Sequence, residues 1–149
     1  MKICLVCSAG GHLTELIQLK EVYEQYDHFF ITLKRQDAID LAKKEKIYFI
    51  SDPERNPIKF IANLFQSFWI LIKEKPNIIL STGAGMAIPV CYIGKIFRSK
   101  IIFIESFCRI KEPSLTGKII YPIADLFLVQ WREQLKKYGN KAIYSGSVF

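Results

Sequence analysis

The sequence lacks an apolar run long enough to cross a bilayer. Its longest apolar region, residues 58–72, is interrupted by polar side chains and falls short of the roughly 20 apolar residues that a spanning helix needs. A β-type run begins at Lys2, which predicts that no secretory signal peptide is present. Low-complexity tracts and internal repeats are missing, while half of the residues are hydrophobic. We therefore expect a single folded domain over residues 1–149.

Cysteine is scarce, and the four that occur predict neither a redox centre nor a zinc site. Cys4 and Cys7 form a C-x-x-C, but inside a predicted strand, where residues three apart point to opposite faces. A redox-active C-x-x-C sits at the start of a helix, and zinc needs more than one close pair. We interpret all four, including Cys91 and Cys108, as small apolar residues in a reducing cytoplasm. No metal is expected.

Negative charge is scarce in the second half of the chain. Lys and Arg outnumber Asp and Glu by 10 to 4 in residues 76–149, but only by 11 to 10 in residues 1–75. The resulting net charge of +7 suits an anionic partner that carries phosphate, acidic lipid or nucleic acid. A basic surface without a specific partner is the alternative.

The G-x-G-x-x-G fingerprint of dinucleotide-binding proteins is also missing. The second predicted strand ends in Thr32-Leu-Lys34, with no acidic residue placed to bind a ribose. Both absences argue against an NAD enzyme.

Strand-like and helix-like segments alternate from end to end, which predicts an α/β fold with a Rossmann-like, doubly wound parallel sheet. The predicted strands cover residues 2–7, 28–33, 47–50, 77–81, 100–104, 125–130 and 142–144. The predicted helices cover residues 13–26, 35–45, 58–75, 86–97, 114–121 and 131–138. The fourth and fifth strands are almost wholly apolar, as strands covered on both faces require.

Glycine-rich loops follow two of these strands at the edge where open parallel sheets bind ligands. Gly10 and Gly11 follow the first strand, and they either let the backbone approach a ligand or simply close a tight turn. Thr82, Gly83 and Gly85 follow the fourth strand, where backbone N–H groups could hold a phosphate or sugar oxygen or could cap a helix. These loops predict a binding site at the carboxyl edge of the sheet.

His12 and Glu105 are the candidate catalytic residues at that edge. His12 falls at the start of a helix, whose dipole favours the neutral imidazole that can accept a hydroxyl proton; capping or packing is the alternative. Glu105 ends an apolar strand and could bind sugar hydroxyls or act as the base; an ion pair with Arg109 or Lys111 is the alternative. The expected substrate-binding residues are Gly10, Gly11, Thr14, Thr82, Gly83, Gly85, Ser106 and Arg109.

The predicted helix over residues 58–75 carries Phe60, Phe65, Phe68 and Trp69, with lysines at its ends. Trp and Phe flanked by Lys are typical of a membrane interface. Contact with lipid, contact with a partner chain and burial in the core remain open.

Several stretches resemble a split glycosyltransferase family. They are S-A-G-G-H-L-T-E at 8–15, S-T-G-A-G at 81–85, and above all I-E-S-F-C-R-I at 104–110 with the segments at 113–118 and 121–131. The family comprises the membrane-anchoring subunit of the UDP-GlcNAc transferase of eukaryotic asparagine-linked glycosylation, and its bacterial capsule and exopolysaccharide relatives. More distantly, the chain is similar to the N-terminal half of the peptidoglycan transferase that makes lipid II.

The resemblance implies the acceptor-side, N-terminal half of a GT-B fold that works with a second chain carrying most of the donor site. It implies inverting transfer from a UDP-sugar to a polyprenyl-diphosphate-linked saccharide, without cofactor, metal or nucleic acid. The Gly10-Gly11-His12 loop would face the donor diphosphate and the acceptor, and Glu105 falls where the peptidoglycan enzyme has a functional Glu. A self-sufficient nucleotide-sugar enzyme and a regulatory nucleotide-binding module are the alternatives.

The eukaryotic subunit begins with a transmembrane segment, which this sequence lacks. This departure predicts peripheral attachment to the cytoplasmic face of a bacterial plasma membrane.

Overall fold

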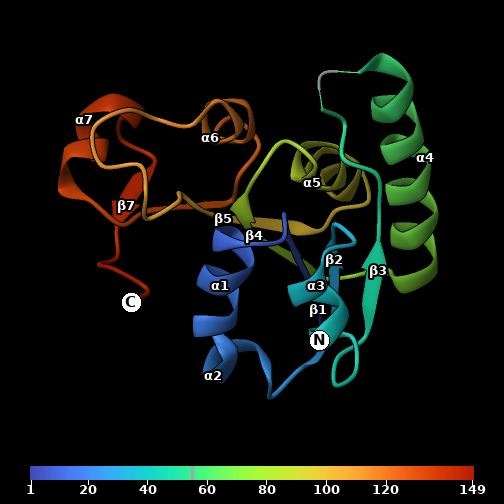
Figure 1. The fold of residues 1–149 in the computed structure, drawn as a ribbon. Coiled ribbons are helices and arrows are strands. Elements are labelled where there is room, and N and C mark those ends of the chain that lie inside the picture. Colours follow the sequence, from blue (N-terminus) through green and yellow to red (C-terminus); the bar gives the residue numbers. More distant parts are fainter. Residues whose placement is uncertain (55) are drawn as a thin grey trace.

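The computed structural model describes residues 1–54 and 56–149 and has a seven-stranded parallel sheet with helices on both faces (Figure 1). The strands are β1 (Lys2–Cys7), β2 (Asp27–Thr32), β3 (Ile47–Phe49), β4 (Ile78–Gly83), β5 (Lys100–Ile104), β6 (Leu126–Val129) and β7 (Ala142–Tyr144). Their order is β3-β2-β1-β4-β5-β6-β7, so the predicted doubly wound sheet is confirmed. The strand order reverses between β1 and β4, and their carboxyl ends form the switch point where such folds bind ligands.

The helices are α1 (Gly11–Gln18), α2 (Lys20–Tyr23), α3 (Gln36–Leu41), α4 (Pro57–Glu74), α5 (Ala87–Ile96), α6 (Leu115–Ile120) and α7 (Leu135–Tyr138), with a 3₁₀ turn η1 (Arg132–Gln134). The single helix predicted over residues 13–26 is wrong, because the backbone leaves helical geometry at Leu19. The break lets Tyr23 pack its buried ring edge-on against His28 and Phe30. The helix predicted over residues 35–45 ends early, at Leu41. Only one alanine and three charged residues follow Leu41, so no apolar side chains continue the helix face that packs against the core.

Three of the four cysteines lie in the core. Cys4, Cys7 and Cys91 are buried, and burial raises the pKa of all three thiols, that of Cys91 to about 12. Cys108 is exposed, so its interpretation as an apolar packing residue is wrong. It lies in the loop after β5 and lines a cleft at the carboxyl edge of the sheet, which is described below.

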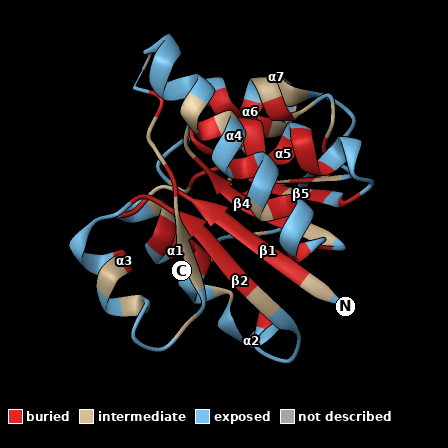
Figure 2. Ribbon diagram, turned by 90° about the vertical axis from the view of Figure 1, so that its right-hand side faces the viewer, coloured by how far each residue is buried: buried red, intermediate tan, exposed pale blue. Residues whose placement is uncertain are grey.

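Helix α4 turns three polar side chains inward beside Leu71, namely Asn63, Ser67 and Glu74, and Figure 2 shows most of its ribbon as exposed in front of the buried strands. Asn63 is buried and donates to the carbonyl oxygen of Ser51 at 2.8 Å, while Ser67 donates to Oδ1 of Asn63 at 3.1 Å. At the end of the helix, buried Glu74 binds Lys2 and Lys46. The apolar side of α4 therefore faces outward, and in the described part of the chain no helix meets the length and apolarity needed to cross a membrane.

Candidate functional site

A cleft of about 430 Å³ opens at the carboxyl edge of the sheet, between α1, the end of β4 and the loop after β5. Gly83 closes β4 with φ +118°, a backbone conformation that favours glycine, and a Cβ there would meet the ring of His12 at 3.3 Å. Gly10 has φ +88° and precedes α1, with open space where a side chain would be. Both glycine loops thus keep their backbones close to the cleft.

His12 is the second residue of α1 and lines the cleft with a half-buried ring. Its Nδ1 is buried and has no hydrogen-bond partner among the residues that the structure describes. Its backbone carbonyl accepts a hydrogen bond from Oγ1 of Thr82 at 2.8 Å, which fastens the start of α1 to the end of β4. The ring therefore lies in the first turn of α1, beside the end of β4.

Glu105 is 1% exposed, and neutral donors surround its carboxylate. Oε1 accepts from the backbone N–H of Ser106 at 2.9 Å; Oε2 accepts from the N–H and the hydroxyl of Ser114, each at 3.0 Å, and from the Tyr138 hydroxyl. Burial, together with the adjacent carboxylate, raises the pKa of Tyr138, so its phenol stays protonated and donates. An ion pair with Arg109 or Lys111, one of the alternatives above, is not found among the described residues.

The carboxylate of Glu105 joins the end of β5 to the start of α6. Ser114 caps α6, because its hydroxyl also accepts the N–H of Gly117 at 2.8 Å. A Cβ at Gly117 would lie 2.6 Å from Oε2 of Glu105 and would meet the Tyr138 hydroxyl. Glycine is therefore the residue that leaves room for this network.

Glu15 is a site residue that the sequence reasoning missed. It is 3% exposed and accepts from Oγ of Ser106 at 2.9 Å and from the N–H of Phe107 at 3.1 Å. Burial raises the pKa of Glu15, and these hydrogen bonds oppose the shift without cancelling it. Its position three residues after His12, on the same side of a helix, was the available signal.

The loop after β5 is also held from the end of β6. Gln130 donates to the carbonyl oxygen of Glu105 at 3.0 Å, and the indole N–H of Trp131 donates to that of Phe107 at 2.7 Å. The Phe107 and Trp131 rings pack with their centroids 5.1 Å apart. Contacts from α1, α6 and β6 thus fix the loop that carries Arg109 to the cleft.

The structure brings only some of the predicted site residues into the cleft wall. His12, Glu105, Gly11, Gly83, Ser106 and Arg109 line it. The hydroxyls of Ser106 and Thr82 are used internally, and Thr14 bonds back to the carbonyl of Gly10 at 3.2 Å. Gly10, Thr14, Thr82 and Gly85 lie beside the cleft rather than in its described wall.

Chemically, the cleft offers an imidazole, a guanidinium and the start of a helix, which together can bind an anionic group and accept a proton from a hydroxyl. Within residues 1–54 and 56–149, no group of three His, Cys, Asp or Glu side chains is placed to hold a metal ion.

Comparison with known proteins gives a family and a fold. Residues 51–148 match the family model described as oligosaccharide biosynthesis protein Alg14 like. The chain is 24% identical over 181 residues to the UDP-N-acetylglucosamine transferase subunit ALG14 of Mus musculus, covering 99% of this chain and 83% of the relative. It is 28% identical over 168 residues to the UDP-N-acetylglucosamine transferase subunit alg14 of Schizosaccharomyces pombe, covering 94% and 80%.

Among solved structures, Acinetobacter baumannii MurG superimposes with a TM-score of 0.80 at 12% identity. The UDP-N-acetylglucosamine 2-epimerase of Rickettsia bellii superimposes with a TM-score of 0.78 at 17% identity. The matches cover 98% and 99% of this chain but only 46% and 45% of those proteins, so the chain spans a little under half of each. The expected equivalence to one half of a GT-B fold is confirmed.

Proposed function

The chain belongs to the Alg14-like family of oligosaccharide biosynthesis proteins, and from this premise we propose that it is the acceptor-binding, activating subunit of a two-component glycosyltransferase. A second chain, equivalent to the C-terminal half of a GT-B enzyme, would bring the donor site. Together they would transfer a sugar from a UDP-sugar to a polyprenyl-diphosphate-linked saccharide. We place this reaction in bacterial capsular or exopolysaccharide synthesis, at the cytoplasmic face of the plasma membrane, with peripheral attachment.

One observation carries the proposal: proteins named as transferase subunits match the chain nearly end to end. It covers less than half of each of the two solved structures described above, yet 83% of a relative whose name calls it a transferase subunit. The second chain would cover the cleft at the carboxyl edge of the sheet and enclose the donor.

The cleft suggests how the subunit would contribute to the reaction. The acceptor hydroxyl oxygen would form a bond to the anomeric carbon of the donor sugar as the bond from that carbon to the UDP phosphate oxygen breaks. His12 would take the hydroxyl proton, and Arg109 with the start of α1 would bind diphosphate. Between the two candidate bases we favour His12, because the oxygens of Glu105 already accept four hydrogen bonds.

The test is a transfer assay with labelled UDP-glucose, UDP-galactose and UDP-GlcNAc and a lipid-diphosphate-sugar acceptor. It compares this chain, the candidate partner and their mixture. Activity that appears, or rises strongly, only in the mixture is the expected result. Robust turnover by this chain alone would instead favour a self-sufficient enzyme, and no effect on any donor would favour a regulatory module.

A further inference from the structure

Glu15 ties two walls of the cleft together. It lies on the inward side of α1, with Leu13 and Leu16 as the other buried residues of that helix. Its Oε1 accepts hydrogen bonds from two donors on the loop after β5, the hydroxyl of Ser106 at 2.9 Å and the N–H of Phe107 at 3.1 Å. An ionised carboxylate accepts hydrogen bonds and donates none, so it suits a place where two donors converge on one oxygen.

The hydrogen bonds of Glu15 continue through a tight turn to Arg109. The N–H of Arg109 donates to the carbonyl oxygen of Ser106 at 2.9 Å, so residues 106–109 form a β-turn. Glu15 accepts from the first two residues of this turn, and the carbonyl oxygen of Arg109, at its end, accepts from buried Gln134 at 2.8 Å. Because the side chain of Arg109 is exposed, these backbone contacts set the position from which its guanidinium group reaches the cleft.

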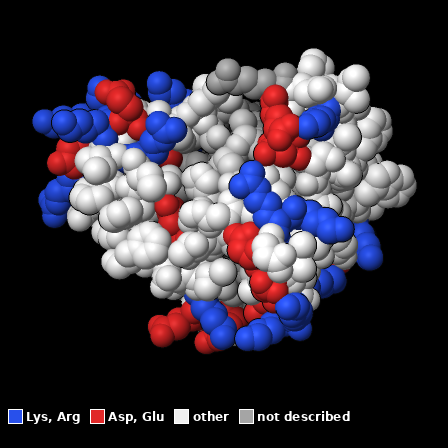
Figure 3. Space-filling view, viewed as in Figure 1, with Lys and Arg blue, Asp and Glu red and all other residues white. Residues whose placement is uncertain are grey.

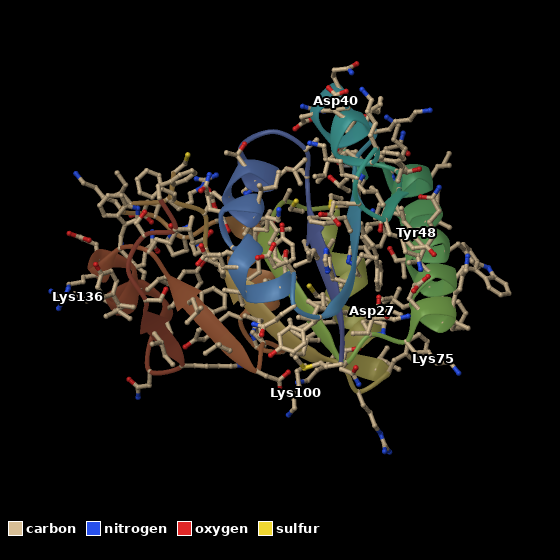
Figure 4. All side chains as sticks on the ribbon, turned by 90° about the horizontal axis from the view of Figure 1, so that it is seen from below. Asp27, Asp40, Tyr48, Lys75, Lys100 and Lys136 are labelled. Atoms are coloured by element: carbon tan, nitrogen blue, oxygen red, sulfur yellow. The ribbon has the colours of Figure 1, made fainter. Side chains whose placement is uncertain are left out.

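Arg109 is the cation on which anion binding in the cleft depends. In the part of the chain that the structure describes, no other lysine or arginine lines the cleft. Figure 3 shows Lys and Arg in several separate groups rather than in one patch. In Figure 4, the labelled Lys75, Lys100 and Lys136 lie at the outside of the molecule. Such scattered charge attracts anions without placing them, so the position of a diphosphate in the cleft depends on Arg109.

The negative charge of Glu15 makes a purely electrostatic role easy to recognise. Like charges repel, so a carboxylate in the wall of the cleft disfavours a bound diphosphate. On these grounds alone, removing the charge should strengthen diphosphate binding, whichever residue replaces Glu15. A residue that holds the turn behaves differently, because losing its acceptor oxygens should weaken binding. The two roles therefore predict effects of opposite sign.

We propose that Glu15 is a positioning residue, which holds the turn at residues 106–109 so that Arg109 presents its guanidinium group to a diphosphate in the cleft. The inference rests on the proposed function, in which Arg109 binds diphosphate, and it names the residue that places Arg109. Glu15 acts through its hydrogen bonds to Ser106 and Phe107 and does not itself bind the diphosphate.

The test measures the affinity of the purified chain for inorganic pyrophosphate by titration calorimetry. Glu15→Ala removes both acceptor oxygens and should bind about 10- to 100-fold more weakly, which corresponds to one lost hydrogen bond between charged groups. Glu15→Gln keeps an acceptor oxygen in place of Oε1 and puts its amide nitrogen where Oε2 accepts a long hydrogen bond of 3.4 Å from Gln130. It should therefore bind at least as tightly as the wild type. Glu21→Ala, which removes an exposed glutamate of α2, is the matched control for the lost charge and should not weaken binding.

Three outcomes of this titration overturn the proposal. They are a wild type that does not bind pyrophosphate, a Glu15→Ala variant that binds as tightly as the wild type or more tightly, and a Glu15→Gln variant that binds as weakly as Glu15→Ala. A further comparison uses Arg109→Lys, which keeps a charge but replaces the planar fork by a flexible amine that gains less from a fixed turn. Glu15→Ala should cost less affinity in that background than in the wild type. An equal cost would show that the variant loosens the cleft in general, and it too would overturn the proposal.

Amide hydrogen exchange follows the turn without any ligand. The N–H of Arg109 bonds to Ser106 and not to Glu15, yet it should exchange faster in Glu15→Ala while the amides of β1 exchange as in the wild type. Unchanged exchange at Arg109 would reject the positioning role.

Two-chain transfer separates this inference from the proposed function. Glu15→Ala should raise KM with little change in kcat, and the substrate whose KM rises, the lipid-diphosphate-sugar acceptor or the UDP-sugar, is the one whose diphosphate Arg109 holds. Transfer with both KM values unchanged would reject the positioning role and leave the proposed function intact. If the wild-type mixture transfers no sugar, the proposed function fails, while the pyrophosphate and exchange measurements still decide the role of Glu15.

Discussion

Replacing Glu105 with glutamine separates an anchoring role of this side chain from a catalytic one. The amide has the same shape but one acceptor oxygen in place of two. With that oxygen at the place of Oε2, the bonds from Ser114 and Tyr138 survive, and the amide nitrogen faces the N–H of Ser106, donor against donor. The variant loses one hydrogen bond to a charged group and leaves a buried donor without an acceptor. We therefore expect the free energy of unfolding to fall by about 2–4 kcal/mol. The melting midpoint should fall by roughly 5–15 °C.

Urea denaturation gives the stability change, and the two-chain transfer assay gives kcat and KM well below both melting midpoints. If Glu105 anchors the loop, Glu105→Gln should raise KM for the acceptor more than it lowers kcat. Tyr138→Phe is the companion variant, since it removes one donor, keeps the carboxylate and should cost about 1–2 kcal/mol. A Glu105→Gln protein with unchanged stability and turnover lowered about 10²–10⁴-fold, the effect of a lost general base, would refute this reasoning.

Three further changes probe other parts of the structure. His12→Gln should lower turnover of the two-chain enzyme about 10²–10⁴-fold with little change in melting temperature, as measured by single-turnover transfer and calorimetry. Gly117→Ala should lower the free energy of unfolding, measured by urea denaturation, by about 1–3 kcal/mol, because the new Cβ would meet Glu105. The control Gly85→Ala should be nearly neutral, because a Cβ there would point into open space. Burial alone would raise the pKa of Glu74. Hydrogen bonds from Lys46, Tyr48 and Lys2 outweigh that effect and lower the pKa from 4.5 to about 2. Its stabilising effect should be present above pH 4.5 and lost as pH falls towards 2, so the stability gap to Glu74→Gln should close over that window; a constant gap would contradict the assignment.

The sheet could be predicted because its signals are local. Each strand is a short apolar run next to a helical pattern, and the rule that ligands bind beyond strand ends placed Gly83 and Glu105 at one edge. The partners of Glu105 could not be predicted, because Tyr138 is 33 residues away and no local pattern pairs the two. For α4 the composition left contact with lipid, contact with a partner chain and burial in the core open, and it did not show which side faces the core. The orientation depends on the hydrogen bonds that Asn63 donates to the carbonyl oxygens of Ser51 and Met86. Only the tertiary structure brings these groups together.

The bracing of the loop after β5 has a consequence for the order of folding. Ser106 bonds to Glu15 across 91 residues, and Gln130 reaches the same carboxylate across 115. Closing such long loops is slow compared with forming a strand-helix-strand unit, and during synthesis the N-terminal part folds first. The N-terminal elements β1, α1 and β4 can therefore assemble first. The loop after β5, which forms the remaining side of the cleft, is fixed only when the segment from β6 to Tyr138 has folded. We therefore expect the cleft to form after β1, α1 and β4 have assembled, so in refolding the amide of Phe107 should gain protection from exchange after those of β1.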